Sequence, residues 1–199
     1  VINKKKMLSY KESLKILKET NALIEGHFIL SSGLHSNQYI QCAQLLSKPK
    51  KASLICSSLA EKIKTEFNSI DIILSPAMGG IIIGYEIGRL LNIETIFSER
   101  INGKFFLRRD FKIPINSNVL IIEDVITTGK SSLECAQIIN ESKAKVIGYA
   151  CIIDRSNNKS LLKNKIVSQV EIDIPTYEND KLPEKLKKIK AIKPGSRGV

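Results

Sequence analysis

The sequence predicts an α/β domain with a mainly parallel sheet flanked by helices. Short apolar stretches rich in β-strand formers alternate along the chain with longer amphipathic stretches of helical period. Residues 71–74, 94–98, 119–122 and 145–153 are such strand-like stretches, and each is followed by residues that suit a turn or a ligand contact. Because parallel sheets bind ligands beyond the carboxyl ends of their strands, we expect one site at that edge.

The composition limits the class of protein. The chain has 199 residues, of which 43% are hydrophobic and 26% charged, as in a soluble globular domain. No apolar run approaches the roughly 20 residues of a membrane span, and no apolar signal core follows the basic N-terminus. We therefore expect no membrane partner and a cytoplasmic location. The cysteines form no CxxC pair, so we expect buried hydrophobic side chains at Cys42, Cys56, Cys135 and Cys151.

The formal net charge is +11, and nucleic-acid binding is one explanation for it. The lysines, however, are spread along the chain, and no basic cluster interleaved with aromatic residues is present. A lysine-rich composition, or a positive field that attracts a polyanionic substrate, explains the charge better. We expect no nucleic-acid partner.

The N-terminal part predicts a helix and then a hairpin. Residues 9–24 have a helical apolar pattern, and Ser9 with Glu12 forms a capping box. Residues 26–41 (GHFILSSGLHSNQYIQ) contain two strand-like segments around a turn at 31–33. The serines of this turn are either turn formers or donors to a carboxylate or an oxo-substituted ring, and position alone does not decide between these.

The next segment has the pattern helix, strand, glycine turn, helix. Helical patterns at 50–67 and 81–91 enclose the strand 71–74 and the turn 75–80 (SPAMGG). The adjacent Gly79 and Gly80 allow backbone N–H groups to approach a ligand, although a close helix–sheet contact is an alternative. Their place at a strand's carboxyl end favours a ligand loop.

The strand 94–98 leads into a cationic hairpin at 100–109 (RINGKFFLRR). Asn102-Gly103 is a strong hairpin signal. A solvated hairpin explains the pattern, but cations around a mobile tip also suit closure over phosphates. These cations are Arg100, Lys104, Arg108 and Arg109.

The segment 119–132 (VLIIEDVITTGKSS) combines an apolar strand, the acids Glu123 and Asp124, and a hydroxyl-rich loop before a helical stretch at 133–142. It is not a nucleotide-binding P-loop, because Asp124 stands where that motif requires its first glycine. Backbone N–H groups, hydroxyls and the helix dipole suit a single phosphate. The acids then suit ribose hydroxyls or a magnesium-bound group.

The last third of the chain predicts two further strands and a short Lys-rich helix with a loose end at 180–199. The strand 145–153 ends at Asp154-Arg155, and the next strand covers 167–172. No internal repeat or dividing linker is apparent, so we expect one domain over 1–199.

Segment 119–132 resembles the phosphoribosyl diphosphate (PRPP) motif of type I phosphoribosyltransferases. Segment 26–41 resembles the N-terminal segment of the orotate phosphoribosyltransferase family, and Asp154-Arg155 resembles its orotate-contacting arginine. The order and spacing agree from about 9 to about 155. The resemblance implies a type I phosphoribosyltransferase-like, mainly parallel sheet flanked by helices at about 50–175, with a small N-terminal hood at about 1–45.

The resemblance also implies a reaction and a site. PRPP and orotate would give orotidine 5'-monophosphate and pyrophosphate in pyrimidine biosynthesis, with Mg²⁺ held mainly by PRPP and water near Asp124. A homodimer would contribute the cationic loop from the partner. The implied catalytic residues are Glu123, Asp124, Arg100 and Lys104. The implied PRPP-binding residues are Glu123, Asp124, Val125, Ile126, Thr127, Thr128, Gly129, Lys130, Ser131, Met78, Gly79, Gly80 and Arg100. The implied orotate-binding residues are Thr127, Arg155, Ser32, Gly33 and Tyr39.

The chain departs from the family pattern at its cations. Many members carry Arg-Lys-x-x-Lys-x-His in the mobile loop, where this chain has residues 99–104 (ERINGK), and lysines often found elsewhere are replaced by Ser31 and Gly79. Two alternatives are a purine phosphoribosyltransferase and a non-catalytic, PRPP-sensing regulator that binds nucleic acid. The Ser-Gly hairpin and Arg155 argue against the first, and the intact acid pair argues against the second.

Overall fold

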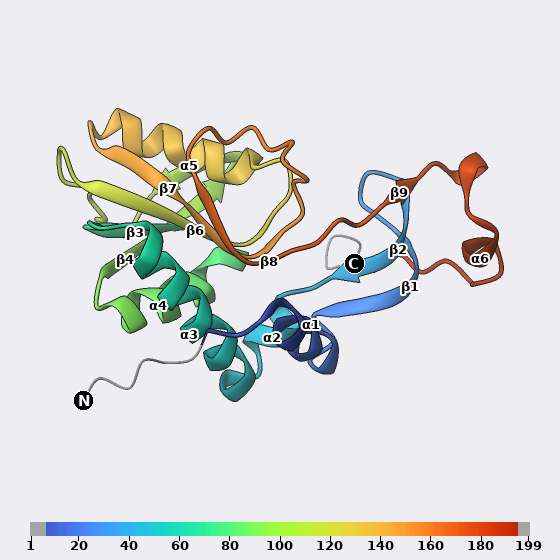
Figure 1. Ribbon diagram of the computed structural model, residues 1–199. Helices are drawn as coiled ribbons and strands as arrows, with labels where there is room; N and C mark the ends of the chain where they lie inside the picture. Colours follow the sequence, from blue (N-terminus) through green and yellow to red (C-terminus); the bar gives the residue numbers. More distant parts are fainter. Residues whose placement is uncertain (1–6, 195–199) are drawn as a thin grey trace.

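The computed structural model describes residues 7–194 and contains two sheets (Figure 1). The main sheet has the strand order β5-β4-β3-β6-β7-β8, in which all neighbours are parallel except the hairpin pair β4 and β5. The expected mainly parallel sheet is confirmed. Its strands are β3 (Ile72–Pro76), β4 (Glu94–Ile101), β5 (Lys104–Leu107), β6 (Asn118–Ile126), β7 (Lys145–Asp154) and β8 (Ile166–Glu171).

Helices cover both faces of this sheet (Figure 1). The helices α3 (Pro49–Glu66) and α4 (Gly79–Leu91) pack on one face, and α5 (Lys130–Glu141) packs on the other. The strand β6 alternates between two cores: Val119 and Ile121 lie in the core on the α5 side, whereas Leu120 and Ile122 lie in the core on the α3–α4 side. None of the helices within residues 7–194 is both long and apolar enough to span a bilayer.

The second, smaller sheet forms the hood, with the order β1-β2-β9. The strands β1 (Leu23–Ile29) and β2 (His35–Ile40) are the expected hairpin, and β9 (Thr176–Tyr177) pairs with β2. Ile192 forms a parallel bridge with Phe28 of β1. The hood sheet therefore combines the N-terminal hairpin with a C-terminal segment that includes the short helices η1 (Asn179–Lys181) and α6 (Glu184–Lys187).

The first helix is shorter than its apolar pattern predicted. The helix α1 (Tyr10–Glu19) has the expected capping box, in which the Glu12 N–H donates to Ser9 Oγ over 3.2 Å and the Ser9 N–H donates to a Glu12 carboxylate oxygen over 2.8 Å. The prediction of a helix to residue 24 was wrong, because Asn21 adopts φ 60° and Leu23 begins β1. Leu23 is buried as the first residue of a strand, so its helical spacing from Leu14 and Leu17 did not indicate a helix.

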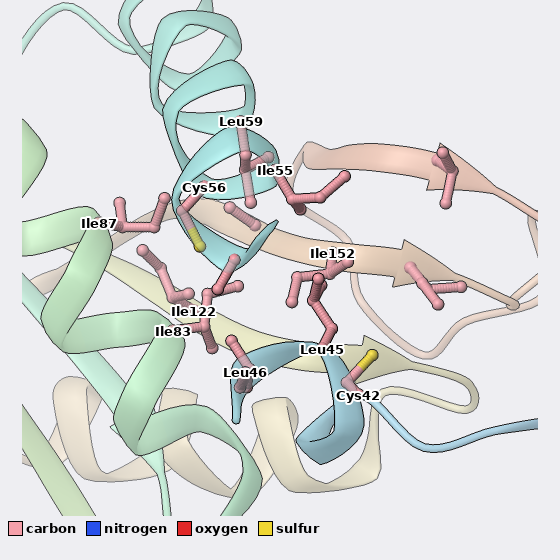
Figure 2. Close-up of a cluster of buried hydrophobic side chains, with 14 of the residues drawn as sticks. Cys42, Leu45, Leu46, Ile55, Cys56, Leu59, Ile83, Ile87, Ile122 and Ile152 are labelled. Carbon is pink, nitrogen blue, oxygen red and sulfur yellow. The ribbon is translucent and has the colours of Figure 1, made fainter. Parts of the chain in front are cut away.

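A short helix that the sequence did not reveal links the hood to the main sheet. The helix α2 (Ala43–Leu46) places Leu45 and Leu46 among apolar side chains of α3, α4 and the sheet (Figure 2). Cys42 precedes it, and its Sγ lies 3.9 Å from the backbone oxygen of Asp124 as a weak donor. All four cysteines are free and buried, as expected.

Replacing Leu45 by alanine tests whether α2 anchors the hood. Leu45 is fully buried, so Leu45→Ala should lower the free energy of unfolding by about 2–5 kcal/mol. Leu54→Ala is the matched control, since Leu54 on α3 is half exposed and should cost only about 0.5 kcal/mol. Urea unfolding followed by circular dichroism measures both, and equal losses would show that α2 contributes no specific packing.

Candidate active site

The acids Glu123 and Asp124 lie near the carboxyl end of β6, and both are partly buried. The Ser132 hydroxyl donates to Glu123 Oε2 over 2.5 Å, and the Val125 N–H donates to Asp124 Oδ1 over 3.0 Å. Burial raises the pKa of Glu123 to about 7, the Ser132 hydrogen bond lowers it, and the Asp124 charge raises it further. Burial likewise raises the pKa of Asp124.

Within residues 7–194, neither acid forms an ion pair. The charge of Arg100 lowers the pKa of Glu123 without forming an ion pair. Two adjacent, partly buried carboxylates without an ion-pair partner are complementary to ligand hydroxyls or to a hydrated cation. The oxygen donors fit magnesium, which prefers hard oxygen ligands and keeps several waters. The described residues contain no group of three or more potential metal-binding side chains, so most ligands of such an ion would come from substrate and water.

A hydroxyl-rich loop follows the acids. Thr127 and Thr128 are exposed, Gly129 adopts φ 77°, and α5 begins at Lys130, whose N–H donates to Thr128 Oγ1 over 3.4 Å. The first N–H groups of α5 and the positive end of its dipole therefore face this loop. Ser131, in the first turn of α5, is half-buried. The arrangement suits a single phosphate group.

A second loop lies against the acids. Residues 77 and 78 connect β3 to α4, so the predicted turn at 75–80 was too long: Ser75 and Pro76 end β3, and Gly79 and Gly80 begin α4. The Ala77–Met78 peptide is cis, and the Ala77 N–H donates to the Ser98 oxygen over 2.8 Å. A Cβ atom added at Gly79 would lie 2.7 Å from Asp124 Oδ1. A side chain at position 79 would therefore have to displace the Asp124 carboxylate. The structure thus brings the Met78–Gly80 loop and the acid pair together.

The cationic hairpin β4–β5 forms as expected, but its arginines are engaged within the subunit. Arg100 forms an ion pair with Glu134 of α5 at 2.8 Å, donates to the Gly103 oxygen, and lies 4.0 Å above the Phe105 ring. Lys104 is exposed and makes no ion pair with the described residues. It is thus the hairpin cation with most freedom to meet a ligand.

The remaining two cations of this hairpin share one carboxylate. Arg109 lies 2.8 Å and Arg108 3.6 Å from Glu99. Both arginines are more than half exposed, so each ion pair contributes little to stability.

Arg155 follows β7, the neighbour of β6. Its N–H donates to the Ile126 oxygen over 2.8 Å, which fixes the backbone beside the hydroxyl-rich loop. Burial lowers the pKa of its half-buried guanidinium, and no carboxylate within residues 7–194 pairs with it. An unpaired, partly buried guanidinium suits a ligand carboxylate.

The hood residues lie on a separate element from the strand ends. Ser32 and Gly33 are exposed in the turn between β1 and β2, where Gly33 adopts φ 84°. Tyr39 is half-buried, with its ring 5.7 Å from that of Phe28 and its hydroxyl 3.4 Å from Gln41 Oε1. Their role in binding a base stays a prediction.

Two residues that touch this site were missed from the sequence, Cys42 and Glu134. Ser132 belongs to the predicted hydroxyl-rich segment, but its contact with Glu123 was not predicted. Ser132 had a usable signal, because it is the first residue of the buried stripe Ser132, Cys135, Ala136 and Ile139 on α5. Cys42 and Glu134 had none, because their contacts join segments far apart in the chain.

Comparisons with known proteins agree with this geometry. The phosphoribosyl transferase domain family matches residues 42–184. The chain is 46% identical over 189 residues to the orotate phosphoribosyltransferase of Parvibaculum lavamentivorans, covering 93% of this chain and 97% of that protein.

Solved structures share the fold at lower identity. The orotate phosphoribosyltransferase of Aeropyrum pernix superposes with a TM-score of 0.70 at 22% identity, covering 79% of this chain and 92% of that one. The adenine phosphoribosyltransferase of Thermoanaerobacter pseudethanolicus has a TM-score of 0.60 at 14% identity, covering 68% and 88%. The fold alone therefore does not select the base.

The raised pKa of Glu123 predicts how stability depends on pH. Between its unfolded value of 4.5 and its folded value of about 7, the folded state holds a proton that the unfolded state has lost. Wild-type stability should therefore fall across that window relative to Glu123→Gln, which does not titrate. The difference should grow by up to about 3 kcal/mol between pH 4.5 and 7.5 in metal-free urea unfolding. A difference independent of pH would contradict the buried, charge-disfavouring environment of Glu123.

Proposed function

The chain belongs to the orotate phosphoribosyltransferase family, and from this premise we propose that it transfers the 5-phosphoribosyl group of PRPP to orotate. The products are orotidine 5'-monophosphate and pyrophosphate, in the cytoplasmic synthesis of UMP. The observation that carries the choice of orotate is Arg155, a partly buried guanidinium without a carboxylate partner among residues 7–194, on the strand next to the acid pair. A purine base carries no carboxylate for such a residue.

The phosphate loop and the acids hold PRPP in this proposal. Residues 125–131, with Thr127 and Thr128 exposed, bind the 5'-phosphate through N–H groups and hydroxyls. Glu123 and Asp124 accept hydrogen bonds from the ribose hydroxyls. Their charge stabilises the cationic sugar carbon as its bond to pyrophosphate stretches, and a well-placed group of this type contributes about 2.7–4 kcal/mol.

The leaving pyrophosphate needs cations and a dry site. Mg²⁺ near Asp124, held mainly by PRPP and water, supplies charge neutralisation when bound. Met78, Gly79 and Gly80 offer backbone N–H groups to the same region, and Lys104 and Arg100 add positive charge from the hairpin. To contact the ligand, Arg100 must first break its ion pair with Glu134. Lys104 forms no ion pair within the described residues and is free to contact the ligand. Closure of the hairpin excludes water from the activated sugar.

Orotate binds between Arg155 and the hood. The Arg155 fork pairs with the orotate carboxylate, and Thr127 donates near the ring. The Ser32-Gly33 turn and Tyr39 cover the base from the hood. Pyrophosphate leaves as an anion and the attacking ring nitrogen is acidic, so little general acid–base catalysis is required.

We propose that the enzyme is a homodimer that uses the exposed face of α4. Ile82 and Tyr85 are 55% and 67% exposed on this helix, and Met78 at its start is 82% exposed. Cavities of about 290 and 370 Å³ flank the two helix residues, with mainly apolar linings. Such an apolar face suits a second subunit. It adjoins the Met78–Gly80 loop, so a partner seated here would bring its hairpin towards this site.

An ultraviolet assay of orotate consumption with PRPP and Mg²⁺ tests the proposed reaction. Turnover with orotate but not with hypoxanthine or adenine is the expected result. Arg155→Ala should raise the Michaelis constant for orotate about 10–100-fold while the constant for PRPP changes little. Lys64→Ala, which removes one charge from a surface ion pair on α3, is the control and should match wild type. Salt-dependent nucleic-acid binding without turnover would instead indicate a regulator.

Replacing Tyr85 by aspartate tests the proposed interface. A buried unpaired carboxylate disfavours association, so the variant should sediment near the chain mass of 22.2 kDa and the wild type near twice that value. Tyr10→Asp, at a similarly exposed tyrosine on α1, should leave the dimer intact. A dimeric Tyr85→Asp protein would place the interface elsewhere.

A further inference from the structure

Ser132 is a fully buried polar residue whose hydroxyl lies at the acid pair. It is the first residue of the inward face of α5, where Cys135, Ala136 and Ile139 follow at helical spacing. Ser131, its neighbour, is half-buried in the phosphate loop. Because Ser132 has no exposed surface, it cannot itself touch a substrate.

The strand geometry explains why this hydroxyl meets Glu123. The side chains of Val119 and Ile121 belong to the core on the α5 side of β6, so the two-residue period places Glu123 on the same side. Asp124 follows on the other face, beside Gly79. The two acids of the motif therefore lie on opposite faces of β6, Glu123 against α5 and Asp124 beside the start of α4.

The hydrogen bond between Ser132 and Glu123 is short, and no other described group donates to this carboxylate. Ser132 Oγ donates to Glu123 Oε2 over 2.5 Å, and this is the one hydrogen bond of the Glu123 carboxylate within residues 7–194. A partly buried carboxylate with three side-chain torsions has fewer water partners than an exposed one, and a fixed donor helps to keep it in one rotamer. A hydroxyl–carboxylate bond of this length is of the charge-assisted kind.

We propose that Ser132 is a positioning residue for the transfer reaction: its hydroxyl fixes Oε2 of Glu123 so that Oε1 is presented to a ribose hydroxyl of PRPP. This inference rests on the proposed function. It assigns to α5 two distinct tasks, because its first N–H groups bind phosphate while its first buried side chain orients the acid on β6. Ser132 acts only through Glu123 and makes no substrate contact.

A double-mutant cycle on Ser132 and Glu123 tests this assignment. Ser132→Ala removes the hydroxyl while alanine fits the helix, and it should lower kcat/KM for PRPP about 10–100-fold with the KM for orotate unchanged. Glu123→Ala should cost at least as much, and adding Ser132→Ala to it should cost nothing further. Calorimetric binding of PRPP with Mg²⁺ provides the same cycle without turnover.

Ser142→Ala is the matched control. It removes a serine hydroxyl from the other end of α5, where Oγ donates to the Ile138 oxygen, and it should leave every constant unchanged. Melting temperatures of all variants show whether each one folds.

Three results would overturn the proposal. Wild-type kinetics in Ser132→Ala would show that Glu123 needs no such support. An equal loss when Ser132→Ala is added to Glu123→Ala would show a merely structural role. The third result is a wild-type protein that neither binds PRPP nor consumes orotate, which would overturn the proposed function together with this inference. If the wild type does consume orotate, the first two results bear on Ser132 alone.

Discussion

Two adjacent, partly buried carboxylates near the end of a central strand are the constraint on which the site depends. Removing Glu123 and Asp124 from water disfavours their charged forms, as the raised pKa of each shows. The fold partly offsets this cost with the Ser132 hydroxyl and the Val125 N–H. Within residues 7–194, no cation forms an ion pair with either acid. The site therefore suits a ligand that supplies hydroxyls or a bound metal ion.

The sheet determines where the other groups of the site lie. Because β3, β6 and β7 are parallel neighbours, their carboxyl ends bring the Met78–Gly80 loop, the acids and Arg155 to one edge. The α2 segment then connects this edge to the hood, through the buried Leu45 and the contact between Cys42 and the Asp124 backbone. A change in the packing of α2 should therefore affect both the hood and the acid pair.

Local patterns predicted most of the fold. The strand β6, the hairpin turn at Asn102-Gly103 and the Ser9–Glu12 capping box were all apparent from the sequence, because each depends on residues close together in the chain. The end of α1 was mispredicted because Leu23 continues the helical spacing, although its packing is that of a strand. The pairing of β9 with β2 could not be predicted, since it joins residues about 140 apart.

The same distinction holds for the site. The motif residues were predicted from the local sequence pattern, and the proximity of four strand ends was predicted from the parallel arrangement of the sheet. The Arg100–Glu134 ion pair and the approach of Gly79 to Asp124 are products of tertiary packing. They show that Arg100 is already paired with Glu134. They also show that glycine at position 79 leaves room for the Asp124 carboxylate.

A crystal structure with bound orotidine 5'-monophosphate tests the central claim most directly. The account predicts the ribose hydroxyls at hydrogen-bond distance from Glu123 and Asp124, and the base carboxylate paired with the Arg155 guanidinium. A ribose directed away from the acid pair, or a base carboxylate held by another residue, would contradict it.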